Sequence, residues 1–226
     1  MNQILITKEM PNNLEVNLIY DTKKQAKKKI IIFQFLLCII IFSFTCGYSV
    51  YSYNMIKKRN KISDKLIENF SILSLYSDNS NYTASKLSLD NYVISEDKIN
   101  VIGLIEIPKL NITYPILSNV NDNLLKISVC RFYGPMPNEF GNLCIAGHNY
   151  NNNSFFSKIN SLQFDDKVYI YDLSGNKLEY NIYSKFEVDA YNTDCTSQNM
   201  QIKEVTLITC NNLNDTKRIV IKAKLN

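Results

Sequence analysis

An uncharged apolar run at residues 30–50 is the clearest hydrophobic pattern in the chain. Its 21 residues, at a helical rise of about 1.5 Å each, are long enough to cross the hydrocarbon core of a membrane. A cleaved signal peptide is the alternative, but the run is long for one, begins far from Met1 and ends without a small-residue cleavage site. The pattern therefore predicts a retained transmembrane helix over residues 30–50.

Basic residues flank the apolar run on both sides, and the nearer cluster precedes it. Positive charge close to a membrane holds that flank in the cytoplasm. We therefore expect a cytoplasmic segment 1–29 and a single-pass protein of the cell membrane whose C-terminal domain is extracellular. The clusters are Lys23, Lys24, Lys27, Lys28 and Lys29 before the run, and Lys57, Lys58, Arg59 and Lys61 after it.

Residues 51–99 combine a helical pattern with a polar stretch. Apolar residues recur at roughly helical spacing up to residue 75, which predicts a short amphipathic helix. Residues 76–97 are polar with few strong hydrophobic side chains, and they are typical of a linker. The apolar positions of the helix are Met55, Ile56, Ile62, Leu66, Ile67, Phe70, Leu73 and Leu75.

From residue 100 onward the pattern changes to short runs rich in β-branched and aromatic residues, separated by turns. Seven or eight such runs without a long helix between them predict a mainly β domain over 100–226, folded as a closed or nearly closed barrel. The runs are VIGLIEIP (101–108), ITYPIL (112–117), NLCIAGH (142–148), KVYIYDL (167–173), KLEYNIYSKFEV (177–188), EVTLITC (204–210) and RIVIKAKL (218–225).

Composition narrows the classes of function. The net charge of +4 comes mostly from the anchor and its flanks, so nucleic-acid binding is not indicated. Two of the six cysteines, Cys38 and Cys46, lie in the apolar run. The chain has one histidine and no CxxC pair, so a structural zinc site is not expected.

The last two runs place a thiol and a guanidinium at the two shoulders of one hairpin. The first run ends in Cys210, and the return run begins with Arg218. Strand alternation puts Val205 and Leu207 on the core face, and it puts Cys210 and Arg218 on the opposite face. A thiolate is a nucleophile for acyl transfer, and a nearby guanidinium stabilises it or donates hydrogen bonds to an oxyanion.

His148, the only histidine, supplies an acid/base group at the end of the run 142–148. Gly147 beside it permits a sharp turn or the close approach of another strand. Alone, a strand-end cysteine is most often a small buried hydrophobe, and a lone histidine or arginine is most often structural or exposed. The combination of all three favours catalysis.

The segment GNLCIAGH, the strand end TLITC and the downstream Arg218 resemble the three signature regions of the sortase family. The resemblance extends over about residues 101–225, essentially the whole predicted domain. It implies an eight-stranded β-barrel and a cysteine transpeptidase activity.

The resemblance also implies residue roles and partners. Cys210 would attack the carbonyl after threonine in a Leu-Pro-X-Thr-Gly-like sorting signal of a surface protein, and a peptidoglycan precursor or other cell-wall amine would accept the acyl group. His148 would protonate the leaving amine and then deprotonate the incoming one. Arg218 would hold the substrate and its oxyanion, and Thr209 would contact substrate. No cofactor and no metal is expected, although the sequence leaves calcium dependence open.

Within the family, the chain lacks an Asp-Pro-aromatic motif before its first strand, which disfavours class C, and residues 189–204 show no long-helix pattern, which disfavours class B. The remaining resemblance is to class A or class D. Two other functions stay open, namely a non-catalytic membrane-tethered β-barrel binding protein and a cysteine hydrolase of the same fold. The sequence also leaves open whether Cys144 pairs with Cys130 or lies near the active site.

Overall fold

The computed structural model describes residues 13–76, 99–150 and 154–226. The chain forms two compact units, one ending at Ile56 and the other comprising Lys57–Asn226. Each unit is described by itself.

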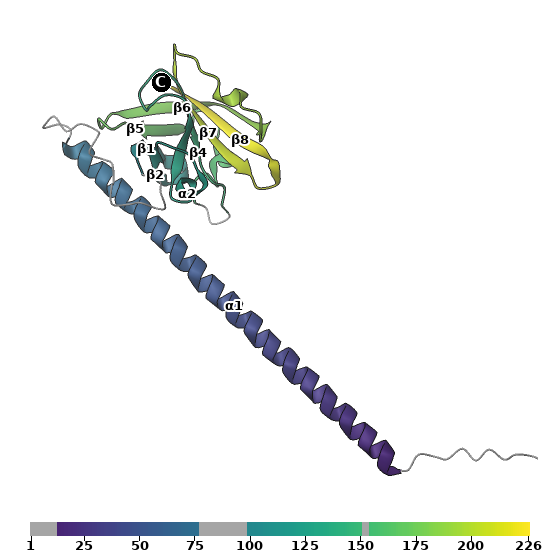
Figure 1. Cartoon of the computed structure of the whole chain (residues 1–226). Helices are drawn as coiled ribbons and strands as arrows, with labels where there is room; N and C mark the ends of the chain where they lie inside the picture. Colours follow the sequence, from purple (N-terminus) through teal and green to yellow (C-terminus); the bar gives the residue numbers. More distant parts are fainter. Residues whose placement is uncertain (1–12, 77–98, 151–153) are drawn as a thin grey trace, which may run out of the picture. The chain divides into compact units, whose positions relative to one another are not determined.

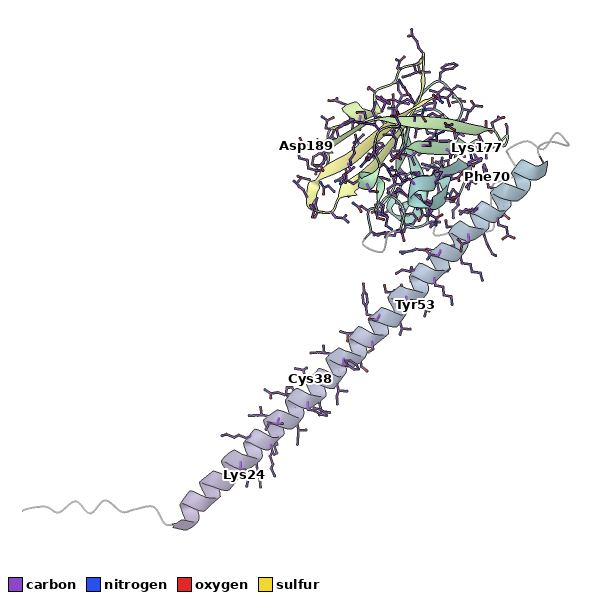
Figure 2. All side chains as sticks on the ribbon, turned by 180° about the vertical axis from the view of Figure 1, so that it is seen from behind. Lys24, Cys38, Tyr53, Phe70, Lys177 and Asp189 are labelled. Carbon is purple, nitrogen blue, oxygen red and sulfur yellow. The ribbon has the colours of Figure 1, made fainter. Side chains whose placement is uncertain are left out.

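A single helix, α1, runs from Asn13 to Tyr76 (Figures 1 and 2). It contains no proline and one glycine, so nothing in its sequence breaks the helical hydrogen bonding. Its apolar side chains at residues 30–50 are all exposed, and the helix is long and apolar enough between Lys27 and Phe70 to cross a membrane. The predicted transmembrane and amphipathic helices are therefore parts of one continuous helix. The predicted linker lies almost entirely outside the described residues.

The C-terminal part of α1 belongs to the second unit. Ile62, Leu66 and Phe70 recur every four residues on one face and are at most 5% exposed. They pack in one apolar cluster with residues of the first strands and of helix α2 (Asp122–Leu125), including Leu104 and Leu124. The amphipathic pattern thus marks a face that covers the outside of the barrel, rather than a free stalk.

Eight strands form a closed barrel in the order β1-β2-β3-β4-β7-β8-β6-β5, as the sequence analysis predicted (Figure 1). Most neighbours are antiparallel, but β2 pairs with β3 and β4 pairs with β7 in parallel. The strands are β1 (Val101–Ile107), β2 (Ile112–Leu117), β3 (Val129–Tyr133), β4 (Gly141–Ala146), β5 (Lys167–Tyr171), β6 (Lys177–Asp189), β7 (Lys203–Asn211) and β8 (Asn214–Leu225).

One strand of the barrel was not predicted from the sequence. Strand β3 was missed because it has only five residues and only its first two are fully buried. The run predicted over 177–188 is the 13-residue strand β6, whose ends, Lys177 and Asp189, lie on opposite sides of the barrel in Figure 2. Short 3-10 turns complete the unit at Pro108–Leu110 (η2), Ile159–Ser161 (η3) and Asp194–Thr196 (η4).

The barrel interior is filled by the alternate residues of its strands and by a plug from the segment after β4. Val205 and Leu207 of β7 are fully buried in this core, as the alternation predicted. Phe156 from the β4–β5 connection is also fully buried there. A closed barrel leaves no strand edge unpaired, so the rim rather than an edge is available for a site.

We predict that Leu66→Ala lowers the stability of the second unit by about 2–5 kcal/mol, because it leaves a cavity under α1. Thermal unfolding of the full chain in detergent, followed by near-UV circular dichroism, measures the loss. Lys61→Ala, an exposed position on the same helix, is the control and should shift stability by less than about 0.5 kcal/mol. An equal effect of both substitutions would show that α1 does not pack on the barrel.

Candidate active site

The parallel pairing of β4 and β7 brings Cys210 and His148 to the same rim of the barrel. Parallel strands end on the same side of a sheet, and Ala146 near the end of β4 lies opposite Ile208 near the end of β7. His148 follows two residues after Ala146, and Cys210 two residues after Ile208. Two residues that lie 62 positions apart in sequence therefore leave the barrel next to each other.

Three hydrogen bonds extend this alignment beyond the strands. The Gly147 N–H donates to the Ile208 carbonyl at 3.1 Å, and the Thr209 hydroxyl donates to the Gly147 carbonyl at 2.7 Å. The Asn149 side-chain amide donates to the Cys210 carbonyl at 2.7 Å. These bonds hold the backbone on both sides of His148 against the backbone of Cys210.

The hairpin of β7 and β8 positions the guanidinium. Cys210 and Arg218 are direct cross-strand partners, so their side chains lie on the same face. That face points away from the core, because Thr209 and Ile219, the next residues on each strand, are buried. The predicted hairpin is therefore present, with both groups on its outer face.

All three predicted catalytic side chains line one groove of about 390 Å³. Strands β4, β7 and β8 form its floor. One wall comes from the segment between β2 and α2, and the other from the end of β6 and the segment that follows it. The lining residues are Val120, Asp122, Leu125, Phe132, Ala146, Gly147, His148, Val188, Ala190, Asn192, Thr193, Cys195, Thr196, Ile208, Thr209, Cys210 and Arg218.

Asn142 of β4 holds the second wall in place. Its side-chain amide donates to the Cys195 carbonyl at 3.0 Å, and its side-chain oxygen accepts from the Thr206 hydroxyl at 2.7 Å. Its backbone N–H donates to the Gln198 side-chain oxygen at 2.8 Å. Because Asn142 is fully buried, each of these bonds satisfies a group that would otherwise be unpaired. The segment between β6 and β7, which contains only the short turn η4, is thereby fastened to the start of β4.

The imidazole of His148 is half-buried and neutral at pH 7. Its ring stacks on Tyr150, with ring centroids 4.6 Å apart. Burial lowers its pKa below 6.5, and Lys126 lowers it further, while Asp122 acts in the opposite direction. Its Nε2 atom has no hydrogen-bond partner among the residues that the structure describes. A neutral imidazole that lines the same groove as the thiol is suited to receive its proton.

Arg218 is held by its own hairpin. Its Nη1 atom donates to the carbonyls of Asp215 and Lys217, both at 2.9 Å. Among the described residues, only this one of its three nitrogens has a hydrogen-bond partner, so donors on Nε and Nη2 stay available to a substrate. A guanidinium fixed by two backbone contacts loses little freedom when it binds an oxyanion.

The other thiols of the barrel differ from Cys210 in their environment. Cys130 and Cys144 are fully buried, and burial raises the pKa of each to about 12. Both carry free thiols, so the pairing that the sequence left open is not formed. Cys195 is also buried and its pKa is raised by burial. Only Cys210, of these four, is partly exposed and lies opposite Arg218.

Thr209 lines the groove, but its side chain is 3% exposed and its hydroxyl is already bonded to Gly147. Its position supports a role in holding the rim together. Contact between Thr209 and a substrate stays a prediction from the sequence.

Within residues 13–76, 99–150 and 154–226, no group of three or more His, Cys, Asp or Glu side chains is arranged to hold a metal ion. The expectation that the chain needs no cofactor stays a prediction, as does its dependence on calcium.

Comparison with known proteins agrees with this geometry. The family model of the Sortase domain matches residues 105–226. The chain belongs to the sortase family. Sortase A of Bacillus anthracis is 35% identical over 134 residues, which cover 58% of this chain and 62% of that relative. The chain thus matches less than two thirds of that sortase's length.

Solved sortases share the fold. A Clostridium perfringens Sortase D5 transpeptidase is 29% identical with a TM-score of 0.57, over 75% of this chain and 99% of that one. Listeria monocytogenes sortase A is 25% identical with a TM-score of 0.52, over 56% of this chain and 87% of that one. Sortase A of Corynebacterium diphtheriae, at 20% identity and a TM-score of 0.53 over 72% and 83% of the two chains, shows the fold alone.

Sequence reasoning missed several residues of this sortase's groove. Asp122 and Tyr150, which act on the imidazole, and Asn142, which holds a wall, were not singled out. Asn142 lies in the quoted segment GNLCIAGH, but nothing in that segment indicated its hydrogen bonds to the wall. Asp122 and Tyr150 belong to no local motif.

We predict that Gly147→Ala displaces the imidazole. A Cβ atom at this position would lie 2.7 Å from the Phe156 ring and 3.0 Å from Val129. The floor of the groove would have to shift, at a cost of about 1–3 kcal/mol. Loss of stability together with a changed chemical shift of the His148 ring confirms the close approach, and an unperturbed resonance contradicts it. Ala146→Gly, one residue earlier, is the control for a change of backbone freedom alone.

We predict that the single imidazole titrates with a pKa below 6.5, measured from the carbon-bound ring protons by NMR. The unfolded chain then binds the His148 proton more tightly than the folded chain does. The contribution of His148 to the free energy of unfolding is therefore constant above pH 6.5, and it is lost as the pH falls from 6.5 through the folded-state pKa. His148→Gln removes this contribution. A titration midpoint of the His148 ring at or above pH 6.5 would show that burial is not the main influence on its pKa.

Proposed function

We propose that this chain is a membrane-anchored sortase, a thiol transpeptidase that cleaves an LPXTG-like sorting signal after threonine and transfers the acyl group to a cell-wall amine. The observation that supports this function is the convergence of one thiol, one imidazole and one guanidinium in a single groove at the rim of the barrel. Family membership makes the same chemistry the expected one.

In the first half of the reaction, the Cys210 sulfur attacks the carbonyl carbon of the threonine. The thiol proton passes to His148, which is neutral at rest and can accept it. The carbonyl oxygen becomes an oxyanion, which accepts hydrogen bonds from the donors of Arg218 not used by the hairpin. The C–N bond then breaks as His148 returns the proton to the leaving amine. A thioester on Cys210 is left.

In the second half, an amine attacks the thioester. His148 takes a proton from the attacking nitrogen, and the new amide forms as the Cys210 sulfur leaves and regains a proton. Water can replace the amine, and the product is then a free acid. The same site therefore performs transfer or hydrolysis according to which nucleophile arrives, and transfer requires that the groove favours the amine.

Helix α1 supports membrane attachment, because its residues 30–50 are uncharged and its side chains there are exposed. We propose a single span with residues 1–29 in the cytoplasm and the barrel outside the cell. The lysines that directly precede the span favour this orientation. Sorting signals of exported proteins and cell-wall amines would then be on the same side as the groove.

We further propose a class D or class A type of sortase. A class A enzyme and a D5 enzyme are among the relatives at 25% identity or more. The segment between β6 and β7 carries only the turn η4, in keeping with the absence of the helix that would favour class B.

We predict that Cys210→Ala abolishes the transfer of a sorting-signal peptide to an amine, because no other described thiol lies opposite a guanidinium. Arg218→Lys should lower kcat about 100-fold to 1000-fold, since lysine cannot present the same donors to the oxyanion. Product formation by the full chain in detergent is followed by chromatography, and the thioacyl intermediate by mass spectrometry.

Cys195→Ala is the matched control, because Cys195 lines the same groove, and it should retain activity within a few-fold. Unchanged turnover in Cys210→Ala would refute the mechanism. Hydrolysis without transfer would identify a cysteine hydrolase, and peptide binding without any product would identify a binding protein.

A further inference from the structure

A second groove, of about 590 Å³, is lined by residues that follow β2 and by β3 with the residue after it. It neighbours the active-site groove, because Val120 and Phe132 line both. The mechanism above uses no part of the second groove. Its lining residues are Ser118, Asn119, Val120, Arg131, Phe132, Tyr133 and Gly134.

Arg131 is the one charged residue of this lining. Its Nε atom donates to the Ser118 carbonyl, and its Nη1 atom donates to the Gly134 carbonyl, both at 3.3 Å. Nη1 also approaches the Met136 sulfur at 3.4 Å. A guanidinium has five N–H donors, so the two on Nη2 are left over. Among the residues that the structure describes, no acidic side chain forms an ion pair with this half-buried cation.

Asp122 lines the active-site groove, together with Val120 and His148. Its carboxylate is near enough to oppose the lowering of the imidazole pKa by burial. In the described part of the chain Asp122 forms no ion pair either. An acidic residue in the first turn of a helix usually stabilises that helix. Because α2 has only four residues, this stabilisation is small and explains little of why a carboxylate stands at position 122.

The second half of the proposed reaction, in which an amine attacks the thioester, benefits from a carboxylate in the active-site groove. An alkyl amine carries a proton at neutral pH, with a pKa of about 10.4 for a lysine-like amine, and an ammonium ion is not a nucleophile. A carboxylate next to the imidazole attracts the ammonium into the groove, where it loses one proton to solvent and attacks as the neutral amine; His148 then takes the second proton from the attacking nitrogen and passes it to the leaving sulfur. A carboxylate further along the same molecule is the group that a free guanidinium edge binds best.

We propose that the two connected grooves form an acceptor subsite, in which Asp122 holds the ammonium group of the incoming amine and Arg131 holds a carboxylate of the same molecule. The inference rests on the proposed function and adds the chemical class of the acceptor, an amine that also carries a carboxylate. Val120 and Phe132 provide the apolar surface between the two charged ends.

The test uses the full chain in detergent, loaded with the sorting-signal peptide, and compares acceptors that differ only in the carboxylate. One pair is Nα-acetyl-lysine and Nα-acetyl-lysinamide, and a second pair with a different spacing is triglycine and triglycinamide. In at least one pair, we expect the acid to have a KM about tenfold lower than its amide. The rate of thioester hydrolysis measured without acceptor is the background that is subtracted for both compounds of a pair.

Two substitutions separate the two charges. Arg131→Gln should raise the KM of the acid to that of the amide while leaving the amide unchanged. Asp122→Asn should raise the KM of acid and amide alike, by about tenfold, whatever its effect on thioester formation, which is measured separately in the absence of acceptor. Lys158→Gln and Asp64→Asn, which remove a like charge outside both grooves, are the controls and should change neither KM.

Equal use of acid and amide by the unaltered chain in both pairs would overturn the inference, even if Arg131→Gln failed to fold. A preference that survives Arg131→Gln, or an amine KM that Asp122→Asn does not change, would overturn it as well. Formation of the thioester with no carboxylate preference rejects this inference alone. Absence of any thioester on Cys210 rejects the proposed function, and this inference with it.

Discussion

The parallel alignment of β4 with β7 is the constraint on which the site depends. It brings together two chain segments that have no local reason to meet, and it fixes which residues of each segment face outward. A slip of one residue would reverse the faces of β7, so that Thr209 would point to the groove and the Cys210 sulfur into the core. The fully buried Val205 and Leu207 resist such a slip, because their side chains would move from the core to the outside. Packing in the barrel therefore sets the orientation of the nucleophile.

The floor and the walls of the groove have different physical origins. The floor consists of strands whose backbone hydrogen bonds belong to the closed barrel, so it is rigid. The walls are short segments held by side chains, such as the segment after β6 that is fastened through Asn142. This division places Cys210 and Arg218 on paired strands and leaves recognition to segments held by side chains. The charges that act on the acceptor in our proposal lie on or beside the wall formed after β2.

The sequence predicted the fold and the three central side chains of the site because each depends on a local pattern. Alternation revealed the outward faces of Cys210 and Arg218, and the apolar run revealed the candidate span. Asp122 and Tyr150 could not be found in this way, since their proximity to His148 arises only when distant strands pair. Strand β3 was not predicted, because its five residues are too few to show the alternation of buried and exposed positions that marks a strand. The single helix α1 was divided into two because its apolar and amphipathic parts differ in composition, although their backbone is continuous.

The apolar face that α1 lays on the barrel has a consequence for how the protein can be shed from a membrane. Cleavage just before Lys57 would free a particle that keeps Ile62, Leu66 and Phe70 in place. Cleavage after Phe70 would instead expose the apolar side chains of Val101, Leu104 and their neighbours to solvent. Exposed apolar patches of this kind cause proteins to self-associate. The point at which a protease cuts the helix would thus decide between a released barrel that stays dispersed and one that aggregates.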